Sequence, residues 1–144
     1  MSSQRIWIEG LPTRLRVIEP LGSGATSRVW RARDLVAGTD VVVKVIDTDG
    51  AAVRLEREAR ALARLRDVDG IVVVHELGRS PSGVGWLVCD LAPGGSLRDR
   101  LSGGRPPDAE EVRPMAGRLA SALAAAHGRR VVHGDLSPAN VLFD

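Results

Sequence analysis

The residues of this sequence that could do chemistry fall into four short groups, of which the first is a glycine pair. Gly22 and Gly24 lie at the turn that joins two stretches, 15–22 and 27–34, whose composition predicts strands. Glycines in such a turn let backbone amides approach phosphate oxygens, because no Cβ stands in the way. The turn does not open a helix, so it is neither a Rossmann fingerprint nor a Walker loop. By itself it is equally compatible with a flexible hairpin.

The second group is a single residue, Lys44, inside the otherwise apolar run 41–46. A buried ammonium group is costly unless an anion pairs with it. On an edge strand Lys44 could instead point to solvent. It is the only lysine of the chain, however, and arginine occupies every other strongly basic position. A single lysine in a chain that otherwise uses arginine favours a functional role for Lys44.

The third group is Glu58, on a predicted helix over 51–66. At about 100° per residue, Glu58 falls in the middle of the apolar stripe that Leu55, Leu62 and Leu65 form. A carboxylate in that position needs a cationic partner, and Lys44 on the preceding strand is the natural candidate. The alternative is a boundary glutamate that is partly exposed to solvent.

The fourth group follows His133 and contains Asp135 and, five residues later, Asn140. Asp135 can accept a proton or orient a hydroxyl, and the side-chain carbonyl of Asn140 can bind a hard cation. A polar turn with a capping aspartate would account for Asp135. It would not explain why the only asparagine of the chain, Asn140, stands at this position.

Strands and helices must position these groups, and their periodicity can be followed along the chain. Five strands with one inserted helix come first, and two further helices precede the fourth group. The expected strands are 15–22, 27–34, 41–46, 71–77 and 84–91, and the expected helices are 51–66, 96–101 and 108–126.

Two further expectations concern the second half of the chain. Asp108 and Glu111 have the spacing of a capping box, and Pro114 should kink the helix that follows or delay its start. The stretch 131–133 predicts a short strand, and 141–143 predicts the strand that pairs with it.

Composition limits the class of protein. A chain of 144 residues with 44 % hydrophobic and 26 % charged residues fits one globular domain. Its formal net charge of +2 is too small for a nucleic-acid footprint, and no apolar run reaches the roughly 18 residues of a membrane span. The single cysteine, Cys89, excludes an internal disulfide and predicts a reducing, cytoplasmic compartment.

In this order, the four groups resemble the protein kinase family, whose signature set is a glycine-rich hairpin, a strand lysine, a helix glutamate and an H-x-D-x-x-x-x-N loop. The resemblance implies an α+β, protein-kinase-like fold. A five-stranded antiparallel N-lobe with one helix would precede the start of a helical C-lobe. It assigns 1–14 to an N-terminal extension, 15–90 to the N-lobe, 91–95 to the hinge and 96–144 to the C-lobe.

The resemblance also implies ATP and Mg²⁺ as cofactors and gives roles to individual residues. Lys44 would pair with the α- and β-phosphates and with Glu58, Asp135 would be the catalytic base, and Asn140 would be a Mg²⁺ ligand. The backbone of Asp90 and Ala92 would meet the adenine edge. The complete set of implied ATP-binding residues is Leu21, Gly22, Ser23, Gly24, Val29, Val42, Lys44, Asp90, Ala92 and Leu142.

The sequence departs from the family pattern at several points, and three of them concern catalysis or its control. Gly134 replaces the arginine that binds the phosphate of a phosphorylated activation loop. Ser137 replaces the lysine that neutralises the charge of the transferred phosphoryl group. The Asp-Phe-Gly segment is absent. We therefore expect a truncated kinase domain that is inactive by itself.

The implied function is ATP-dependent phosphoryl transfer by the parent protein to Ser/Thr hydroxyls of protein substrates, with neither a nucleic-acid partner nor a membrane segment in this chain. One alternative is a small-molecule phosphotransferase similar to the aminoglycoside enzymes, because the His-Gly-Asp sequence at 133–135 matches their loop. A second alternative is a catalytically silent pseudokinase that serves as a nucleotide-binding scaffold, which Ser137 and the truncation favour.

Overall fold

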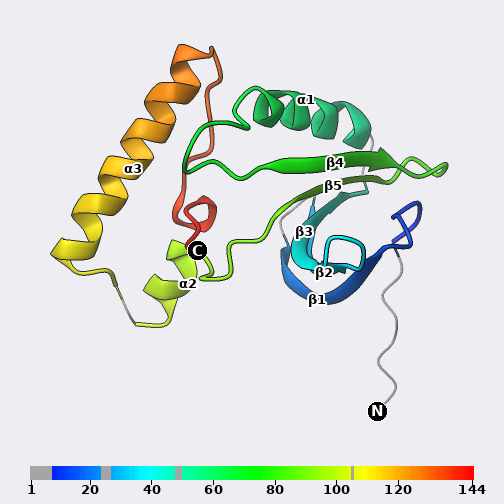
Figure 1. Ribbon diagram of the computed structural model, residues 1–144, viewed down its shortest axis with the longest axis horizontal. Helices are drawn as coiled ribbons and strands as arrows, with labels where there is room; N and C mark the ends of the chain where they lie inside the picture. The colour runs from blue at the N-terminus through cyan, green and yellow to red at the C-terminus, as the bar shows by residue number, and fades with distance from the viewer. Residues whose placement is uncertain (1–7, 24–26, 48–49, 105) are drawn as a thin grey trace. The chain divides into compact units, whose positions relative to one another are not determined.

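The computed structural model describes residues 8–23, 27–47, 50–104 and 106–144. They form two compact units, drawn together in Figure 1. The first unit contains the described residues up to Ala63 together with Val72–Leu91, and the second contains Arg64–Ile71 and Ala92–Asp144. The elements in chain order are β1 (Leu15–Ser23), β2 (Arg28–Asp34), β3 (Thr39–Ile46), α1 (Ala51–Ala63), β4 (Val74–Arg79), β5 (Gly85–Asp90), α2 (Leu97–Ser102), α3 (Ala109–Gly128) and the 3₁₀ turn η1 (Pro138–Asn140).

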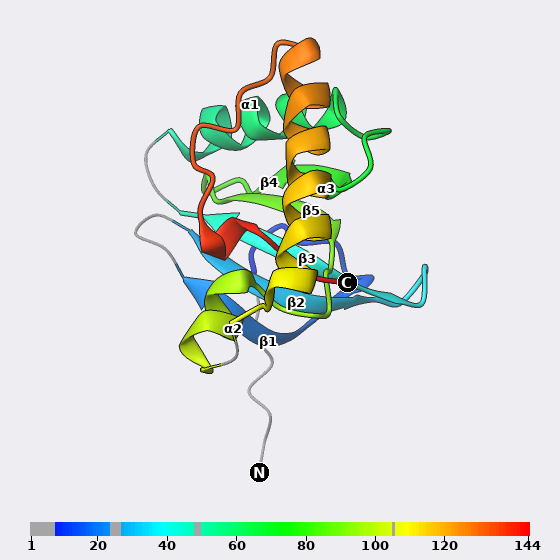
Figure 2. The same ribbon diagram turned by 90° about the vertical axis from the view of Figure 1, so that its left-hand side faces the viewer.

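The first unit is one antiparallel sheet of five strands in the order β1-β2-β3-β5-β4. The helix α1 connects β3 to β4 and packs on one face of the sheet, against β3, β4 and β5. Figures 1 and 2 show it beside β4 from two directions. The five-stranded antiparallel sheet with one helix confirms the fold expected for the N-lobe.

Strand β3 shows how the sequence pattern builds the two faces of this sheet. Side chains alternate along a strand, so Val41, Val43 and Val45 share one face, where they are buried. On that face they pack with a core that includes Trp86 of β5. Lys44 lies between two of these valines in sequence, and therefore projects from the face that α1 covers.

The second core lies between α1 and the sheet. Leu55 is fully buried there and packs with Ile46 and Leu87, and Ala59 and Leu62 line the same contact. This confirms the predicted apolar stripe at Leu55 and Leu62, whereas Leu65 lies beyond the end of the helix. Burial of these side chains is the main force that holds α1 against the sheet, because apolar burial contributes about 25 cal/mol per Å².

In the second unit, α3 begins at Ala109 with the predicted capping box. The carboxylate of Asp108 accepts hydrogen bonds from the amides of Glu110 and Glu111, and Glu111 bonds back to the amide of Asp108. The expectation that Pro114 delays the start of α3 is therefore wrong. Pro114 lies inside the helix and lacks the amide hydrogen that would have bonded to the Glu110 carbonyl.

Other elements also differ from the prediction, and β4 begins at Val74 rather than at residue 71. Helix α1 ends at Ala63 rather than at residue 66, because the Leu65 carbonyl accepts from the Val68 amide in a turn. The stretch 131–133 is not a strand: the Val131 amide bonds back to the Ala126 carbonyl. Its expected partner, 141–143, instead pairs with the segment before α2, where Leu142 forms an isolated bridge with Ser96.

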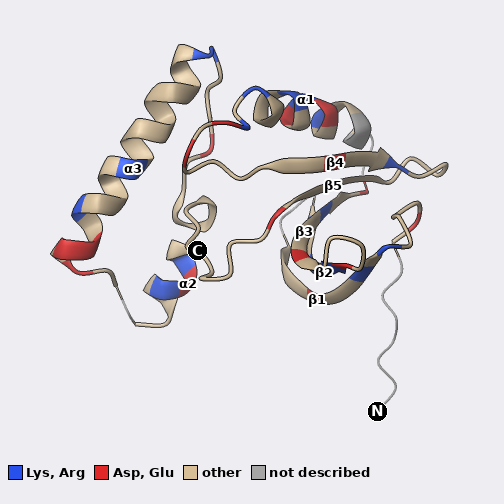
Figure 3. Ribbon diagram, viewed as in Figure 1, with Lys and Arg blue, Asp and Glu red and all other residues tan. Residues whose placement is uncertain are grey.

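Charged residues of both signs interleave along the strands of the first unit (Figure 3). On β2, Arg31 pairs with Glu19 at 3.0 Å and also with Asp40, and Arg33 lies 2.9 Å from Asp40. In the described part of the chain, none of the helices is both long enough and apolar enough to cross a membrane.

Candidate active site

Lys44 and Glu58 form an ion pair in the first unit, as the sequence predicts. The Lys44 Nζ lies 2.7 Å from both carboxylate oxygens of Glu58. The two side chains are 27 % and 36 % exposed, so the pair is partly shielded and still open to a ligand. Because both Glu58 oxygens lie at the same distance, they hold the Lys44 ammonium group in one position.

The local folds of β3 and α1 produce this pair. Lys44 projects toward α1 because its neighbours Val43 and Val45 occupy the opposite face. Glu58 lies one turn after Leu55 and one turn before Leu62, on the stripe that packs against the sheet. The two interpretations of Glu58 both hold in part, since its side chain is partly exposed and also paired.

The glycine-rich residues lie where β1 and β2 meet. Leu21, Gly22 and Ser23 are the last residues of β1, and Gly22 pairs with Val29 of β2. A Cβ on Gly22 would touch nothing within 4 Å, so this glycine leaves open space beside its backbone. Gly24, which belongs to the same prediction, lies outside the described residues.

Cys89 and Val42 lie opposite each other on β5 and β3. Burial raises the pKa of the Cys89 thiol to about 11, and the negative charge of Asp90 adds to the effect. A thiol that stays protonated at neutral pH is a weak nucleophile. Cys89 is therefore a packing residue in this sheet.

Asp135 and Asn140 lie together in the second unit, in the exposed turn that ends with η1. The Nδ2 of Asn140 donates to the Asp135 carbonyl at 2.7 Å and contacts its Oδ2 at 3.3 Å. The Asp135 amide donates to the Nδ1 of His133 at 3.2 Å. Since the nitrogen of Asn140 is used within the turn, its Oδ1 is the atom that remains for a cation.

The rest of this turn is set by backbone geometry. Gly134 has a φ of 75°, a conformation that glycine adopts more readily than residues with a Cβ. Ser137 precedes η1, and its side chain makes no capping hydrogen bond. Leu142 is 46 % exposed next to its bridge with Ser96.

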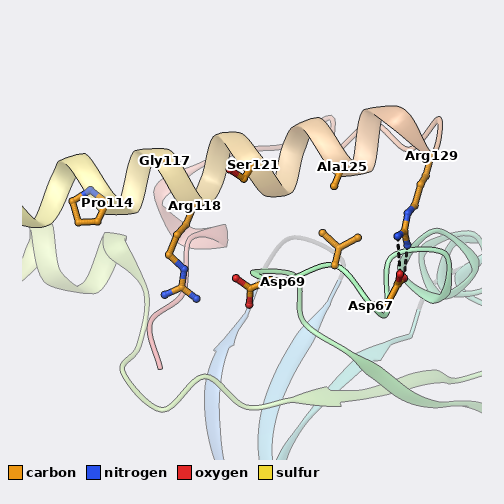
Figure 4. Close-up of a pocket in the computed structure, with 9 residues that line it drawn as sticks. Asp67, Asp69, Pro114, Gly117, Arg118, Ser121, Ala125 and Arg129 are labelled. Atoms are coloured by element: carbon orange, nitrogen blue, oxygen red, sulfur yellow. Dashed lines mark hydrogen bonds and ion pairs between the residues drawn. The ribbon is translucent and has the colours of Figure 1, made fainter.

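A groove of about 610 Å³ also lies in the second unit, between α3 and the segment that follows α1 (Figure 4). Arg129 closes one end of it by pairing with Asp67, and this guanidinium lowers the pKa of Asp67 to about 2. The groove contains none of the predicted site residues. Its lining residues are Asp67, Val68, Asp69, Pro114, Gly117, Arg118, Ser121, Ala125 and Arg129.

Among the described residues, no group of three or more His, Cys, Asp or Glu side chains is arranged to hold a metal ion. The side-chain oxygen of Asn140, the Mg²⁺ ligand that the resemblance implies, nevertheless belongs to the ligand class that Mg²⁺ prefers. Mg²⁺ commonly binds through one or two protein groups together with phosphate oxygens, so this small donor set fits the ion.

Comparison with known proteins agrees with this pattern of residues. The family model described as protein kinase domain matches residues 15–144. Among curated proteins, CBL-interacting protein kinase 22 of Oryza sativa subsp. japonica is 38 % identical, over 86 % of this chain and 32 % of its own length. Serine/threonine-protein kinase pkn2 of Myxococcus xanthus is 35 % identical, over 92 % of this chain and 16 % of its own length.

Serine/threonine-protein kinase PrkC of Bacillus subtilis (strain 168) is 27 % identical, over 91 % of this chain and 21 % of its own length. The chain thus spans between about one sixth and one third of the length of these three relatives. The match to the family model covers most of the chain and includes the Lys44–Glu58 pair and the turn from Asp135 to Asn140. On this evidence, the chain belongs to the protein kinase domain family.

Proposed function

We propose that the protein transfers the γ-phosphoryl group of ATP to Ser/Thr hydroxyls of protein substrates. The observation that carries the proposal is the Lys44–Glu58 pair, in which one ammonium group is held 2.7 Å from two oxygens. A cation fixed in this way is suited to bind phosphate oxygens, because it loses little freedom when the ligand arrives. The curated relatives named as serine/threonine kinases support the substrate class.

Each candidate residue has a defined task in this proposal. Lys44 binds the α- and β-phosphates, and Glu58 orients its ammonium group. Asp135 accepts the proton of the substrate hydroxyl, and the Oδ1 of Asn140 is a ligand for Mg²⁺. When bound, Mg²⁺ neutralises phosphate charge during the transfer.

The remaining residues bind the nucleotide. The backbone of Asp90 and Ala92 contacts the adenine edge, and Gly22 and Ser23 cover the phosphates together with Gly24. Apolar side chains contact the adenine faces; these are Leu21, Val29, Val42 and Leu142. In this scheme residues 15–90 are the ATP-binding lobe, 91–95 are the hinge and 96–144 are the start of the catalytic lobe. The single cysteine, Cys89, favours a reducing, cytoplasmic compartment for the protein.

Ser137 supports one second candidate, a nucleotide-binding scaffold without transferase activity. Its side chain brings no positive charge to the turn that holds Asp135. Removal of one electrostatic donor from a transfer site slows the reaction on the order of 100-fold. The small-molecule phosphotransferase is not favoured, because the curated relatives are protein kinases.

Two measurements test the proposal. Binding of Mg²⁺-ATP by calorimetry should weaken about tenfold or more in Lys44→Met, which removes a charge-assisted contact. Transfer of labelled phosphate to a protein substrate by the natural gene product should be lost in Asp135→Ala. Asp69→Ala, which removes an exposed carboxylate outside the site, is the matched control.

Three outcomes would change the proposal. If the chain bound no ATP, the proposal would fail. Binding of ATP with no transfer by the natural gene product would establish the scaffold instead. Transfer that persists at full rate in Asp135→Ala would show that another group accepts the proton.

A further inference from the structure

A bulge in strand β4 gives His75 an unusual orientation. Val74 pairs with Cys89 of β5 and Glu76 pairs with Val88, so His75 is an extra residue with no partner in the ladder. Such bulges bend a strand and turn a side chain away from the alternation that the rest of the strand follows. Here the imidazole Nε2 of His75 reaches the carboxylate Oδ1 of Asp90, at 2.6 Å.

Asp90 is held by this segment of the chain through three contacts. Its amide donates to the Val73 carbonyl at 3.0 Å, and its Oδ2 accepts from the Val73 amide at 3.3 Å. The contact with His75 is the third. Together they fix both the backbone and the side chain of Asp90, which is the last residue of β5.

The neighbouring charged groups have other partners. Glu56 and Arg60 of α1 and Glu76 of β4 line the same shallow groove as His75. Glu56 and Arg60 lie 3.6 Å from each other, and Glu76 pairs with Arg14. Asp90 is therefore the carboxylate with which His75 interacts, and both side chains are about half exposed.

We propose that His75 is a positioning residue for nucleotide binding, which acts through Asp90. The inference rests on the proposed function, in which the backbone of Asp90 contacts the adenine edge. By holding the Asp90 carboxylate, His75 fixes the backbone that reads the base. His75 does not touch the phosphates, so its contribution should be specific to the adenine part of the ligand.

The test compares two ligands on the full chain, ATP and inorganic tripolyphosphate, by calorimetry. His75→Leu removes the imidazole at similar size, and it should weaken ATP binding about two- to fivefold, a small effect because the pair is half exposed. Binding of tripolyphosphate should stay unchanged. His75→Gln restores a donor toward Asp90, and it should recover most of the affinity. His127→Leu, on an exposed position of α3, is the control.

The outcomes separate the inference from the function on which it rests. If the unchanged chain binds neither ligand, the proposed function fails and the inference fails with it. If that chain binds ATP and His75→Leu binds it equally well, only the inference is overturned. An equal loss for both ligands would show a general structural role and would also overturn it. Asp90→Asn, which weakens the same pair without a change in size, should reproduce the selective loss even if the leucine variant does not fold.

Discussion

At the scale of single residues, the partial exposure of the Lys44–Glu58 pair decides what the pair can contribute. The pair keeps contact with solvent, so little stability is expected from it, because exposed ion pairs contribute at most about 1 kcal/mol. The same exposure leaves the ammonium group accessible to an anion. The pair is thus better suited to ligand binding than to holding α1 in place, which Leu55 and its apolar neighbours do.

Glu58→Gln should separate these two roles. Loss of the carboxylate leaves the Lys44 ammonium less well oriented, so the affinity for Mg²⁺-ATP should fall about three- to tenfold. The thermal unfolding midpoint should change little. Glu56→Gln is the matched control on the same helix, since Glu56 faces Arg60 and not Lys44. Equal ATP affinities for the two variants would contradict the assigned role of Glu58.

Cys89 provides a prediction about pH. At a pKa of about 11, roughly one thiol in a thousand is ionised at pH 8, so alkylation by iodoacetamide should be on the order of 100-fold slower than in the urea-unfolded chain. The folded state binds the thiol proton more tightly than the unfolded state. Stability is therefore unaffected below about pH 9 and falls between about pH 9 and 11. Intact mass against time measures the alkylation, and rapid labelling at pH 8 would contradict the raised pKa of Cys89.

At the scale of elements, strands β4 and β5 fit together at one glycine. The indole of Trp86 lies over Gly78, and a Cβ built on Gly78 would be 1.8 Å from the Trp86 Cζ2. Trp86 is only 4 % exposed and belongs to the main core of the sheet. Its ring cannot move aside without disturbing that core, because protein interiors are close-packed.

Gly78→Ala should therefore destabilise the protein by about 3 kcal/mol, the cost of overpacking a core. Gly117→Ala is the comparison, since a Cβ at Gly117 meets nothing within 4 Å. Because alanine is a better helix former than glycine, Gly117→Ala should stabilise the protein by about 1 kcal/mol. Urea unfolding of both variants measures the two values. Similar stabilities would show that the Trp86 ring can be displaced.

Local periodicity explains which parts of the fold could be predicted. The alternation in β3 and the stripe of α1 are properties of a few neighbouring residues, and they were sufficient to predict that Lys44 and Glu58 meet. The capping box of Asp108 and Glu111 is likewise local. The tasks proposed for the site residues on ATP remain predictions, because they depend on a ligand.

Features that arise from contacts distant in sequence were not predicted. The bulge at His75 depends on how β4 pairs with β5, and no pattern within 71–77 encodes it. Leu142 pairs with Ser96, and not with 131–133, because the segment before α2 offers backbone groups to it. Arg129 meets Asp67 across 62 residues of sequence. Such pairings follow from tertiary packing, which overrides local preference.

At the scale of the whole molecule, burial is unevenly distributed between the two units. The four largest fully buried side chains, Leu55, Leu87, Val43 and Val88, all belong to the first unit. In the second unit, α3 has 20 residues but buries only Ala122 and Ala126, near its C-terminal end. Large apolar side chains of that unit are exposed; they include Val112, Val132 and Leu136.

This distribution predicts how the chain opens. Amides in β3 and β5 are held by a packed core on both faces, so their hydrogen exchange should require the largest opening free energy. Amides in the first half of α3 depend on helical hydrogen bonds with little tertiary packing, and such helices are marginal in water. Exchange followed by mass spectrometry should be at least about tenfold faster for peptides covering 112–118 than for those covering 41–46. Equal rates would show that α3 is stabilised by contacts beyond those of its two buried alanines.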